Sequence, residues 1–221
     1  MERRHIMDVK QTKRYTLGEE IFSSVSHGVG AALAIAGSAV VIVKSAFSGS
    51  AYAVVGASVY SATLIILYIM STLYHSFTNP TAKYVFRIFD HCTIFLLIAG
   101  TYTPLTLVTL RGTTGWVVFG VIWGAAVLGI VLNAVNLERF KIFSMICYVA
   151  MGWAAIFTIR PIIAGIGTGG TVLLITGGVA YTAGLIFYAM KKHRYMHSIW
   201  HLFVLAGSML HYFCILLYVI P

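Results

Sequence analysis

The stretch RYMHSIWH, residues 194–201, opens the last apolar segment of the chain and carries two histidines, His197 and His201. Residues four apart lie on the same face of an α-helix, one turn above each other. Two imidazoles in this arrangement can hold one metal ion, as in helical zinc sites. The spacing alone is weak evidence, because isolated histidine pairs are more often structural, so the surrounding sequence decides its meaning.

The composition places this stretch inside a membrane protein. Of the 221 residues, 59% are hydrophobic and 10% are charged, whereas an ordinary soluble domain carries roughly 25% charged residues. A soluble fold of this length could not bury so much apolar surface, so the chain is expected to cross a membrane several times. The net charge of +9 does not indicate a nucleic-acid partner, because the basic residues are spread over the ends of loops.

Seven apolar segments are long enough to span a bilayer as helices. Each runs about 20 residues or more, which matches a hydrocarbon core of roughly 30 Å, and backbone groups in lipid must find their partners within a helix. The predicted fold is an all-α, seven-helix transmembrane bundle at residues 21–221, preceded by a polar, basic cytoplasmic tail at residues 1–20. The predicted spans are Ile21–Val43, Ala51–His75, Ile88–Val108, Thr114–Asn133, Phe140–Ile159, Gly170–Met190 and His197–Ile220.

The distribution of Lys and Arg predicts which side of the membrane each loop occupies. With the N-terminus in the cytoplasm, twelve basic residues fall inside and three fall outside, which is a strong positive-inside pattern. Seven spans then place the C-terminus outside, in a multi-pass protein of the cell membrane. The three outside residues are Lys44, Arg111 and Arg160.

Ionisable residues gather near the cytoplasmic ends of the predicted spans. His75 ends the second span, Asp90 lies in the first turns of the third, and His197 and His201 begin the seventh. Ionisable groups at membrane depth are costly and usually mark a site. The first span begins on the same side, with Glu19, Glu20 and His27.

Three neutral imidazoles and an open position describe a catalytic zinc site, where zinc lowers the pKa of a bound water to about 7. Asp90 can accept the proton of that water. Ser71, one turn before His75, can donate a hydrogen bond to a developing oxyanion. Iron and copper also accept imidazole ligands. In the alternative interpretation the histidines are hydrogen-bonded within the bundle, Asp90 pairs with Arg87 or His91, and Ser71 is a packing residue.

These residues resemble the signature of the haemolysin III family, the bacterial branch of the progestin and adipoQ receptor family, in a wider grouping with the alkaline ceramidases. The matching motifs are Ser71-x-x-x-His75, Asp90 and His197-x-x-x-His201, and the likeness covers nearly the whole chain. The resemblance implies a seven-helix bundle with Zn²⁺ held by His75, His197 and His201 near the cytoplasmic side. It also implies that Asp90 lies near the water on the metal and that Ser71 belongs to the site.

Three further histidines are expected to be structural. His27 lacks ligand spacing, so it is interpreted as a partner behind the ligands or as a helix-end group. His91 adjoins Asp90 and therefore points about 100° away from it around the helix. His211 lies ten residues beyond His201, roughly 15 Å further along a helix. It cannot share that metal and is interpreted as an interior polar contact or a separate pathway residue.

Two classes of function follow from these residues. The first is a zinc-dependent, ceramidase-like hydrolase of a lipid amide, with a membrane lipid as its partner. The second is a haemolysin-like pore former, or a sensor or receptor of membrane state, with a structural zinc; a closed site in which Asp90 binds the metal favours it. A transporter ranks last, because the ionisable residues cluster at one end. The sequence specifies no substrate and no oligomeric state.

Overall fold

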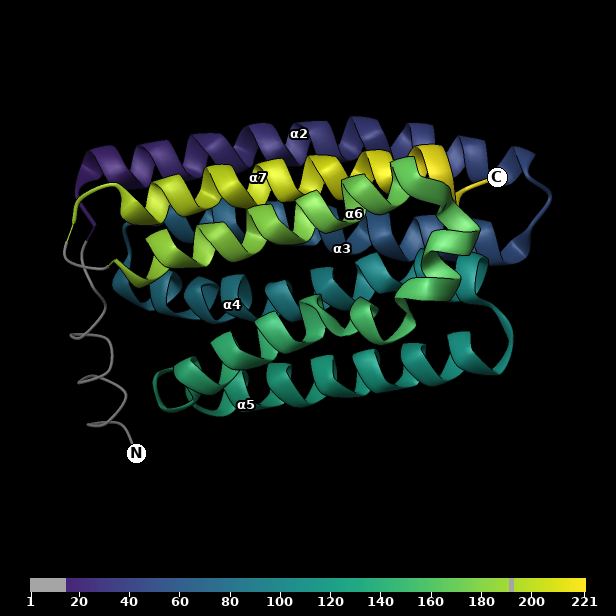
Figure 1. Ribbon diagram of the computed structural model, residues 1–221. Coiled ribbons are helices and arrows are strands. Elements are labelled where there is room, and N and C mark those ends of the chain that lie inside the picture. Colours follow the sequence, from purple (N-terminus) through teal and green to yellow (C-terminus); the bar gives the residue numbers. More distant parts are fainter. Residues whose placement is uncertain (1–14, 191–192) are drawn as a thin grey trace.

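The computed structural model describes residues 15–190 and 193–221, and these residues form helices without a strand among them. This confirms the all-α prediction. The long helices run side by side along one axis (Figure 1). The α-helices are α2 (Leu17–Phe47), α3 (Ala51–Ser76), α4 (Pro80–Pro104), α5 (Gly112–Gly152), α6 (Ile159–Ala189) and α7 (Met196–Cys214). Three short segments complete the order: the π-helices η1 (Leu105–Leu110) and η3 (Ile215–Val219), and the 3₁₀-helix η2 (Ala154–Thr158).

Helix α2 begins within the predicted tail of residues 1–20, at Leu17. Thr16 and Glu19 form a capping box, which satisfies backbone N–H groups that have no partner inside the helix. The hydroxyl of Thr16 accepts from the N–H of Glu19 at 3.3 Å, and the carboxylate of Glu19 accepts from the N–H of Thr16 at 2.8 Å. Residues 1–14 of the predicted tail lie outside the described residues.

Five helices among the described residues are long and apolar enough to cross a membrane, which differs from the seven predicted spans. The three predicted spans between Thr114 and Met190 correspond, except for Met190 itself, to one run of 78 residues, Gly112–Ala189. The backbone leaves helical geometry inside this run at Asn136 (φ −161°, ψ 91°) and Gly167 (φ 65°, ψ −177°). At the first of these breaks α5 folds back on itself (Figure 1). The run Gly112–Ala189 therefore contains several helices in succession, separated by the breaks at Asn136 and Gly167 and by the 3₁₀-helix η2, and the count of five takes them as one.

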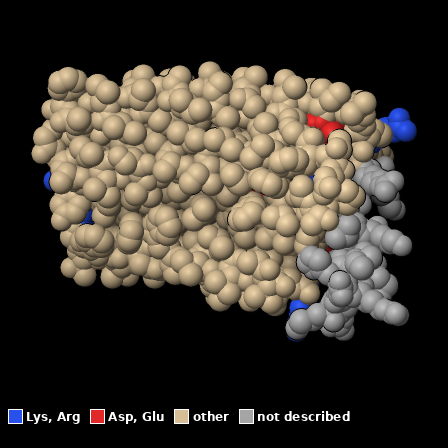
Figure 2. Space-filling model, turned by 180° about the vertical axis from the view of Figure 1, so that it is seen from behind, with Lys and Arg blue, Asp and Glu red and all other residues tan. Residues whose placement is uncertain are grey.

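The flank of the bundle is apolar, as a surface in contact with lipid requires. On the face shown in Figure 2, charged side chains lie towards the two ends and the broad middle is uncharged. Large apolar side chains point outward, among them Val121, Ile146 and Ile186, which are 65%, 63% and 63% exposed. The chain is a multi-pass membrane protein.

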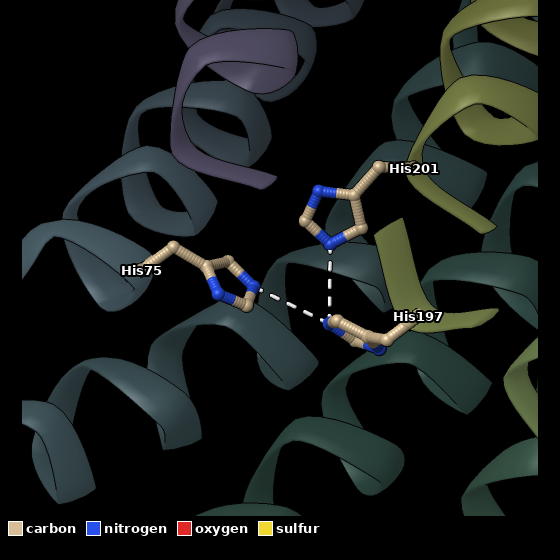
Figure 3. A group of neighbouring side chains, drawn as sticks. All are labelled: His75, His197 and His201. Carbon is tan, nitrogen blue, oxygen red and sulfur yellow. Dashed lines mark hydrogen bonds between the residues drawn. The ribbon is translucent and has the colours of Figure 1, made fainter. Parts of the chain in front are cut away.

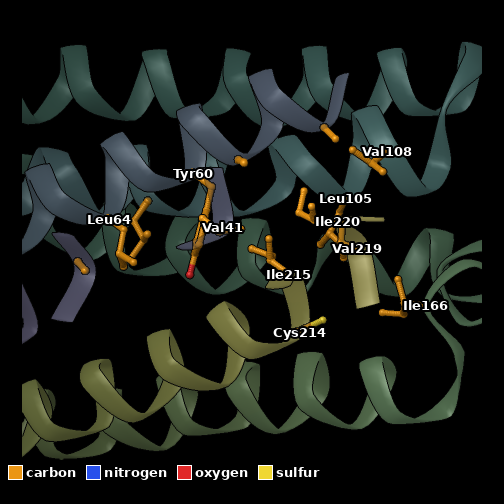
Figure 4. Close-up of a cluster of buried hydrophobic side chains, with 14 of the residues drawn as sticks. Val41, Tyr60, Leu64, Leu105, Val108, Ile166, Cys214, Ile215, Val219 and Ile220 are labelled. Atoms are coloured by element: carbon orange, nitrogen blue, oxygen red, sulfur yellow. The ribbon is translucent and has the colours of Figure 1, made fainter. Parts of the chain in front are cut away.

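A buried apolar core joins α2, α3 and η3. Val41, Tyr60, Leu64 and Ile215 are all at most 5% exposed and belong to one cluster (Figure 4). Packing of this kind, together with interhelical hydrogen bonds, holds helices together in lipid. The core therefore links α2 and α3 to the segment that follows α7, away from the end where the histidines lie.

Candidate metal centre

The starts of α2 and α7 are tied together at the N-terminal end of the bundle, where α3 also ends. The carboxylate of Glu19 accepts a hydrogen bond from the backbone N–H of Tyr195 at 2.8 Å. Tyr195 has a left-handed backbone (φ 60°) immediately before α7. The buried hydroxyls of Ser23 and Ser198 are 3.0 Å apart. An acidic residue of α2 thus secures the turn that presents His197.

Three histidines from two helices meet at this end (Figure 3). His75 comes from the last turn of α3, and His197 and His201 come from the first turns of α7. The Nε2 atom of His197 lies 3.3 Å from Nε2 of His75 and 3.2 Å from Nε2 of His201. Two imidazole nitrogens on one tetrahedral zinc, each at 2.0–2.1 Å, are about 3.3 Å apart. This histidine triad is therefore positioned to bind a metal ion.

The outer ring nitrogens determine where the hydrogens of the triad lie. Nδ1 of His75 is 2.7 Å from the Glu20 carboxylate, and Nδ1 of His201 is 3.3 Å from the carbonyl oxygen of Ser23. Both partners can only accept, so each Nδ1 donates and each neutral ring turns a lone pair on Nε2 towards His197. One N–H on His197 can satisfy only one of these lone pairs. The surplus of lone pairs suits a cation, and the outer contacts are those of metal-binding histidines.

The sequence places Glu20 at the same end of the bundle as the histidines, but it predicted no role for this residue. Its second carboxylate oxygen lies 2.8 Å from Nζ of Lys83 in α4. Lys83 also donates to the carbonyl oxygens of Tyr74 and Phe77, both at 3.3 Å. The signal in the sequence was an acidic residue at the depth of the histidines. Its contact with His75 could not be inferred, because the two residues lie on different helices.

The two predicted catalytic residues occupy different positions relative to the triad. Ser71 lies one turn before His75 on α3 and is 1% exposed, and its hydroxyl has no hydrogen-bond partner among the described residues. Asp90 lies on α4, where its carboxylate is 3.6 Å from Nδ1 of His91. Within the described chain, the group of potential metal ligands comprises the triad without Asp90. The catalytic roles of Ser71 and Asp90 stay predictions.

A cavity of about 80 Å³ lies beside His197. Arg87 and His91 from α4 line it, together with Tyr15, whose ring stacks on His197 with 4.9 Å between the centroids. Burial raises the pKa of Tyr15, so its hydroxyl is protonated near neutral pH and can donate a hydrogen bond. Because the Asp90 carboxylate lies close to His91, the acid is adjacent to one wall of this cavity.

Two histidines predicted to be structural have partners that explain them. Nδ1 of His91 donates to the carbonyl oxygen of Arg87 at 2.9 Å, which leaves Nε2 to accept from the hydroxyl of Tyr188 at 3.3 Å. Nε2 of His211 donates to the carbonyl oxygen of Leu174 at 3.0 Å. The prediction of an interior polar contact for His211 is confirmed.

His27 supports the triad from α2. Its ring stacks on that of His201 with 3.8 Å between the centroids, and it meets the ring of Tyr68 edge-on at 5.0 Å. It is 3% exposed and does not belong to the group of potential metal ligands among the described residues. This position agrees with the predicted place behind the ligands.

The fold and the site define a class: a multi-pass membrane protein whose helices bring three histidines together at one end, where they can hold a metal ion. The chain matches the family model described as Haemolysin-III related over residues 15–212, and it belongs to that family. The motif resemblance is thereby confirmed. Membership also agrees with a location in the cell membrane.

Curated relatives match over most of their length. The chain is 43% identical over 203 residues to Hemolysin-3 of Bacillus cereus, covering 92% of this chain and 93% of that protein. It is 40% identical over 204 residues to the Hemolysin-3 homolog of Bacillus subtilis (strain 168), covering 92% and 96%. A more distant relative is the monocyte to macrophage differentiation factor of Homo sapiens, 26% identical over 163 residues, covering 71% and 67%.

Proposed function

We propose that this protein is a metal-dependent hydrolase of a membrane lipid amide, with zinc held by His75, His197 and His201. The observation that carries the proposal is the set of three Nε2 atoms that face one another at one end of the bundle. Imidazole is a preferred zinc ligand, and catalytic zinc sites use three protein ligands. When bound, zinc supplies Lewis acidity and lowers the pKa of a coordinated water to about 7.

The residues around the triad supply the remaining roles in this proposal. Asp90 acts as the general base that accepts a proton during hydrolysis. Ser71, whose buried hydroxyl has no partner among the described residues, donates a hydrogen bond to the charge that develops on the carbonyl oxygen. Glu20 keeps His75 in the tautomer that presents Nε2, and Lys83 holds Glu20 in place.

The proposal includes seven membrane crossings, with the N-terminus in the cytoplasm and the C-terminus outside. A straight helix of 78 residues would be roughly 117 Å long, and a hydrocarbon core is about 30 Å thick. The run Gly112–Ala189 must therefore cross more than once, and the breaks at Asn136 and Gly167 support its division into separate crossings. Alkaline phosphatase fused after Pro221 should be active, and fusions after Asn136 or Met190 should be inactive. An active fusion at Met190 would contradict this topology.

Hydrolysis of defined lipids tests the enzymatic proposal. Purified protein is incubated with a panel of N-acyl lipids that includes ceramide, and release of fatty acid is followed. We expect release that a chelator abolishes and added Zn²⁺ restores. Asp90→Asn should lower the rate by roughly 100-fold or more while the metal content stays at the wild-type level. Turnover that survives chelation, or no turnover on any lipid of the panel, would contradict the proposal.

Membrane permeabilisation is a second candidate, favoured by the name of the Bacillus cereus relative, Hemolysin-3. In this case the metal at the triad is structural and holds α3 against α7. Purified protein is reconstituted into vesicles loaded with a fluorescent dye. Dye release that depends on the amount of protein supports this candidate, and tight vesicles at every protein-to-lipid ratio remove it.

A further inference from the structure

The inner face of α3 carries a polar stripe that continues from His75 into the bundle. Ser61, Tyr68 and Ser71 are separated by seven and three residues, so their side chains share a helix face with His75. Ser61 is 3% exposed, and Tyr68 and Ser71 are each 1% exposed. The stripe is therefore enclosed by protein at the depth of the hydrocarbon core.

The hydroxyls of Ser61 and Ser71 have no hydrogen-bond partner among the described residues, and the Tyr68 hydroxyl interacts only with the hydroxyl of Ser208 on α7. The neighbouring hydroxyl of Tyr60 has no partner either, and the ring of His27, on the adjacent helix α2, interacts with the backbone of His201 but makes no hydrogen bond of regular geometry. In the described part of the chain, the six buried side-chain atoms without a hydrogen bond of regular geometry are Nδ1 and Nε2 of His27, the hydroxyl oxygens of Tyr60 and Tyr68, and Oγ of Ser61 and Ser71. All six belong to α2 and α3.

Other buried hydroxyls in the described part of the bundle have protein partners, either on their own helix or on a neighbouring one. Ser38 donates to the carbonyl oxygen of Ala34 at 2.6 Å, and Thr101 donates to that of Leu97 at 2.8 Å. A buried polar group without a partner gives up its hydrogen bonds to water, and folded proteins satisfy nearly all such groups. The six atoms without a hydrogen bond of regular geometry lie on two neighbouring helices, which indicates a polar ligand that contacts several at once.

His27 and Tyr68 connect the triad to the middle of the bundle. The ring of His27 lies between those of His201 and Tyr68. Its centroid is 3.8 Å from that of His201 and 5.0 Å from that of Tyr68. Tyr68 and Ser208 line one cavity of about 290 Å³. The Ser208 hydroxyl lies 2.8 Å from that of Tyr181. Figure 4 shows Tyr60 reaching from α3 into the interior with its hydroxyl directed towards α7.

We propose that this stripe binds a file of ordered water molecules that runs from the histidine triad into the centre of the bundle. Water is the ligand that the chemistry favours, because hydroxyl and imidazole groups offer both donors and acceptors and a buried water makes about three hydrogen bonds. A lipid tail offers neither. The file gives the triad a supply of water from within the protein. This inference stands independently of hydrolase activity.

X-ray footprinting of the purified full-length protein tests for the bound water directly. Radiolysis of an ordered water produces a hydroxyl radical that modifies the nearest side chain, even when bulk solvent cannot reach it. We expect Tyr60 and Tyr68 to be modified roughly tenfold faster than Phe95. Phe95 is a suitable control because it is 0% exposed and lies in a separate apolar cluster. Modification of both tyrosines at the rate of Phe95 would overturn the proposal.

Thermal unfolding provides a second test. The sign of the change in Tm shows whether a buried hydroxyl is hydrogen-bonded to a water molecule or has no partner. If Tyr60 holds a water, Tyr60→Phe removes hydrogen bonds and should lower Tm by about 2–4 °C. If the hydroxyl is dry, the same substitution leaves Tm unchanged or raises it, because an unpaired group is removed, and the proposal fails. Tyr102→Phe gives the reference, since the Tyr102 hydroxyl contacts the backbone of Gly152 and Ala155 at 3.2 and 2.7 Å.

Discussion

Helix α7 carries histidines in two regions whose surroundings differ. At its start, His197 and His201 direct their Nε2 atoms towards each other and towards His75, at 3.2 and 3.3 Å. Near its other end, His211 donates from Nε2 to the carbonyl oxygen of Leu174 at 3.0 Å. One region holds more lone pairs than hydrogens, whereas the other pairs a donor with an acceptor. The comparison teaches that the balance of donors and acceptors distinguishes a ligand histidine from a structural one.

The same distinction separates the triad from the histidine on α4. His91 has an acceptor on one nitrogen and a donor on the other, from Arg87 and Tyr188. Its hydrogen-bonding capacity is met within the protein, so a metal ion would have to displace a hydrogen bond to bind there. In the triad, the N–H of His197 can satisfy only one of the two lone pairs that face it, so one lone pair is left without a hydrogen and can bind a metal ion.

The largest expected effect is on metal binding, when the histidine at the start of α7 is replaced and a replacement near the other end serves as the comparison. His201→Ala should reduce metal affinity by at least roughly 100-fold, more than the loss of a residue that only supports a ligand. His211→Ala should retain the wild-type metal content. Elemental analysis of the purified proteins and a zinc titration measure both. Equal metal content in the two variants would show that the two regions of α7 do not differ in metal binding. Unfolding curves for both variants serve as the control that the compared proteins are folded.

A smaller effect is expected from the carboxylate behind the triad. Glu20→Gln removes the charge that holds Nδ1 of His75 and should weaken zinc binding by about 10- to 100-fold. The matched control is Glu138→Gln, because Glu138 pairs with Arg87 and Lys141 instead of a triad residue. Competition with a fluorescent zinc chelator measures both affinities. If Glu20→Gln binds zinc as the wild type does, the contact is merely a surface ion pair.

The structural region of α7 should respond in stability instead of metal binding. His211→Leu removes the hydrogen bond to the carbonyl oxygen of Leu174 and should cost about 1 kcal/mol of unfolding free energy. Thermal unfolding in detergent, with a parallel zinc titration, measures the change. Zinc affinity below the wild-type value would show that His211 is coupled to the triad.

The smallest expected effect concerns the hydroxyl pair that holds α7 against α2. Ser198→Ala removes the contact between Ser198 and Ser23 at 3.0 Å, and hydrogen bonds between membrane helices average about 0.6 kcal/mol. Thermal unfolding measures this loss. We expect zinc affinity to change little, because the tie between Glu19 and the backbone of Tyr195 is kept. A large loss of affinity would show that the serine pair, more than Glu19, sets the position of the triad.

The sequence correctly predicted which three histidines lie at one end of the bundle, but not the contacts that surround them. The four-residue spacing of His197 and His201 fixes them on one helix face, and apolar length placed His75 at the same end. Asp90 was predicted to lie near the water on the metal; the structure places its carboxylate beside His91 and outside the potential ligand group of the described residues, and its role stays a prediction. Depth in the membrane follows from position along a helix, whereas direction around the bundle depends on how each helix packs.

The helix count shows the same limit. Apolar length divided residues 114–190 into three spans, while the structure joins them in the run Gly112–Ala189, where the backbone leaves helical geometry at Asn136 and Gly167. Hydrophobicity reports which residues avoid water. It does not report the backbone angles at a reversal.

The sequence by itself determined that this chain is an all-helical membrane protein and that His75, His197 and His201 lie at one end, because apolar length and helical spacing are local properties. Only the tertiary structure decided that the three Nε2 atoms face one another, that Glu20 and Lys83 stand behind His75, and that a buried polar stripe leads inward from the triad. These contacts join residues on different helices, and helix packing, which no local pattern encodes, sets their directions.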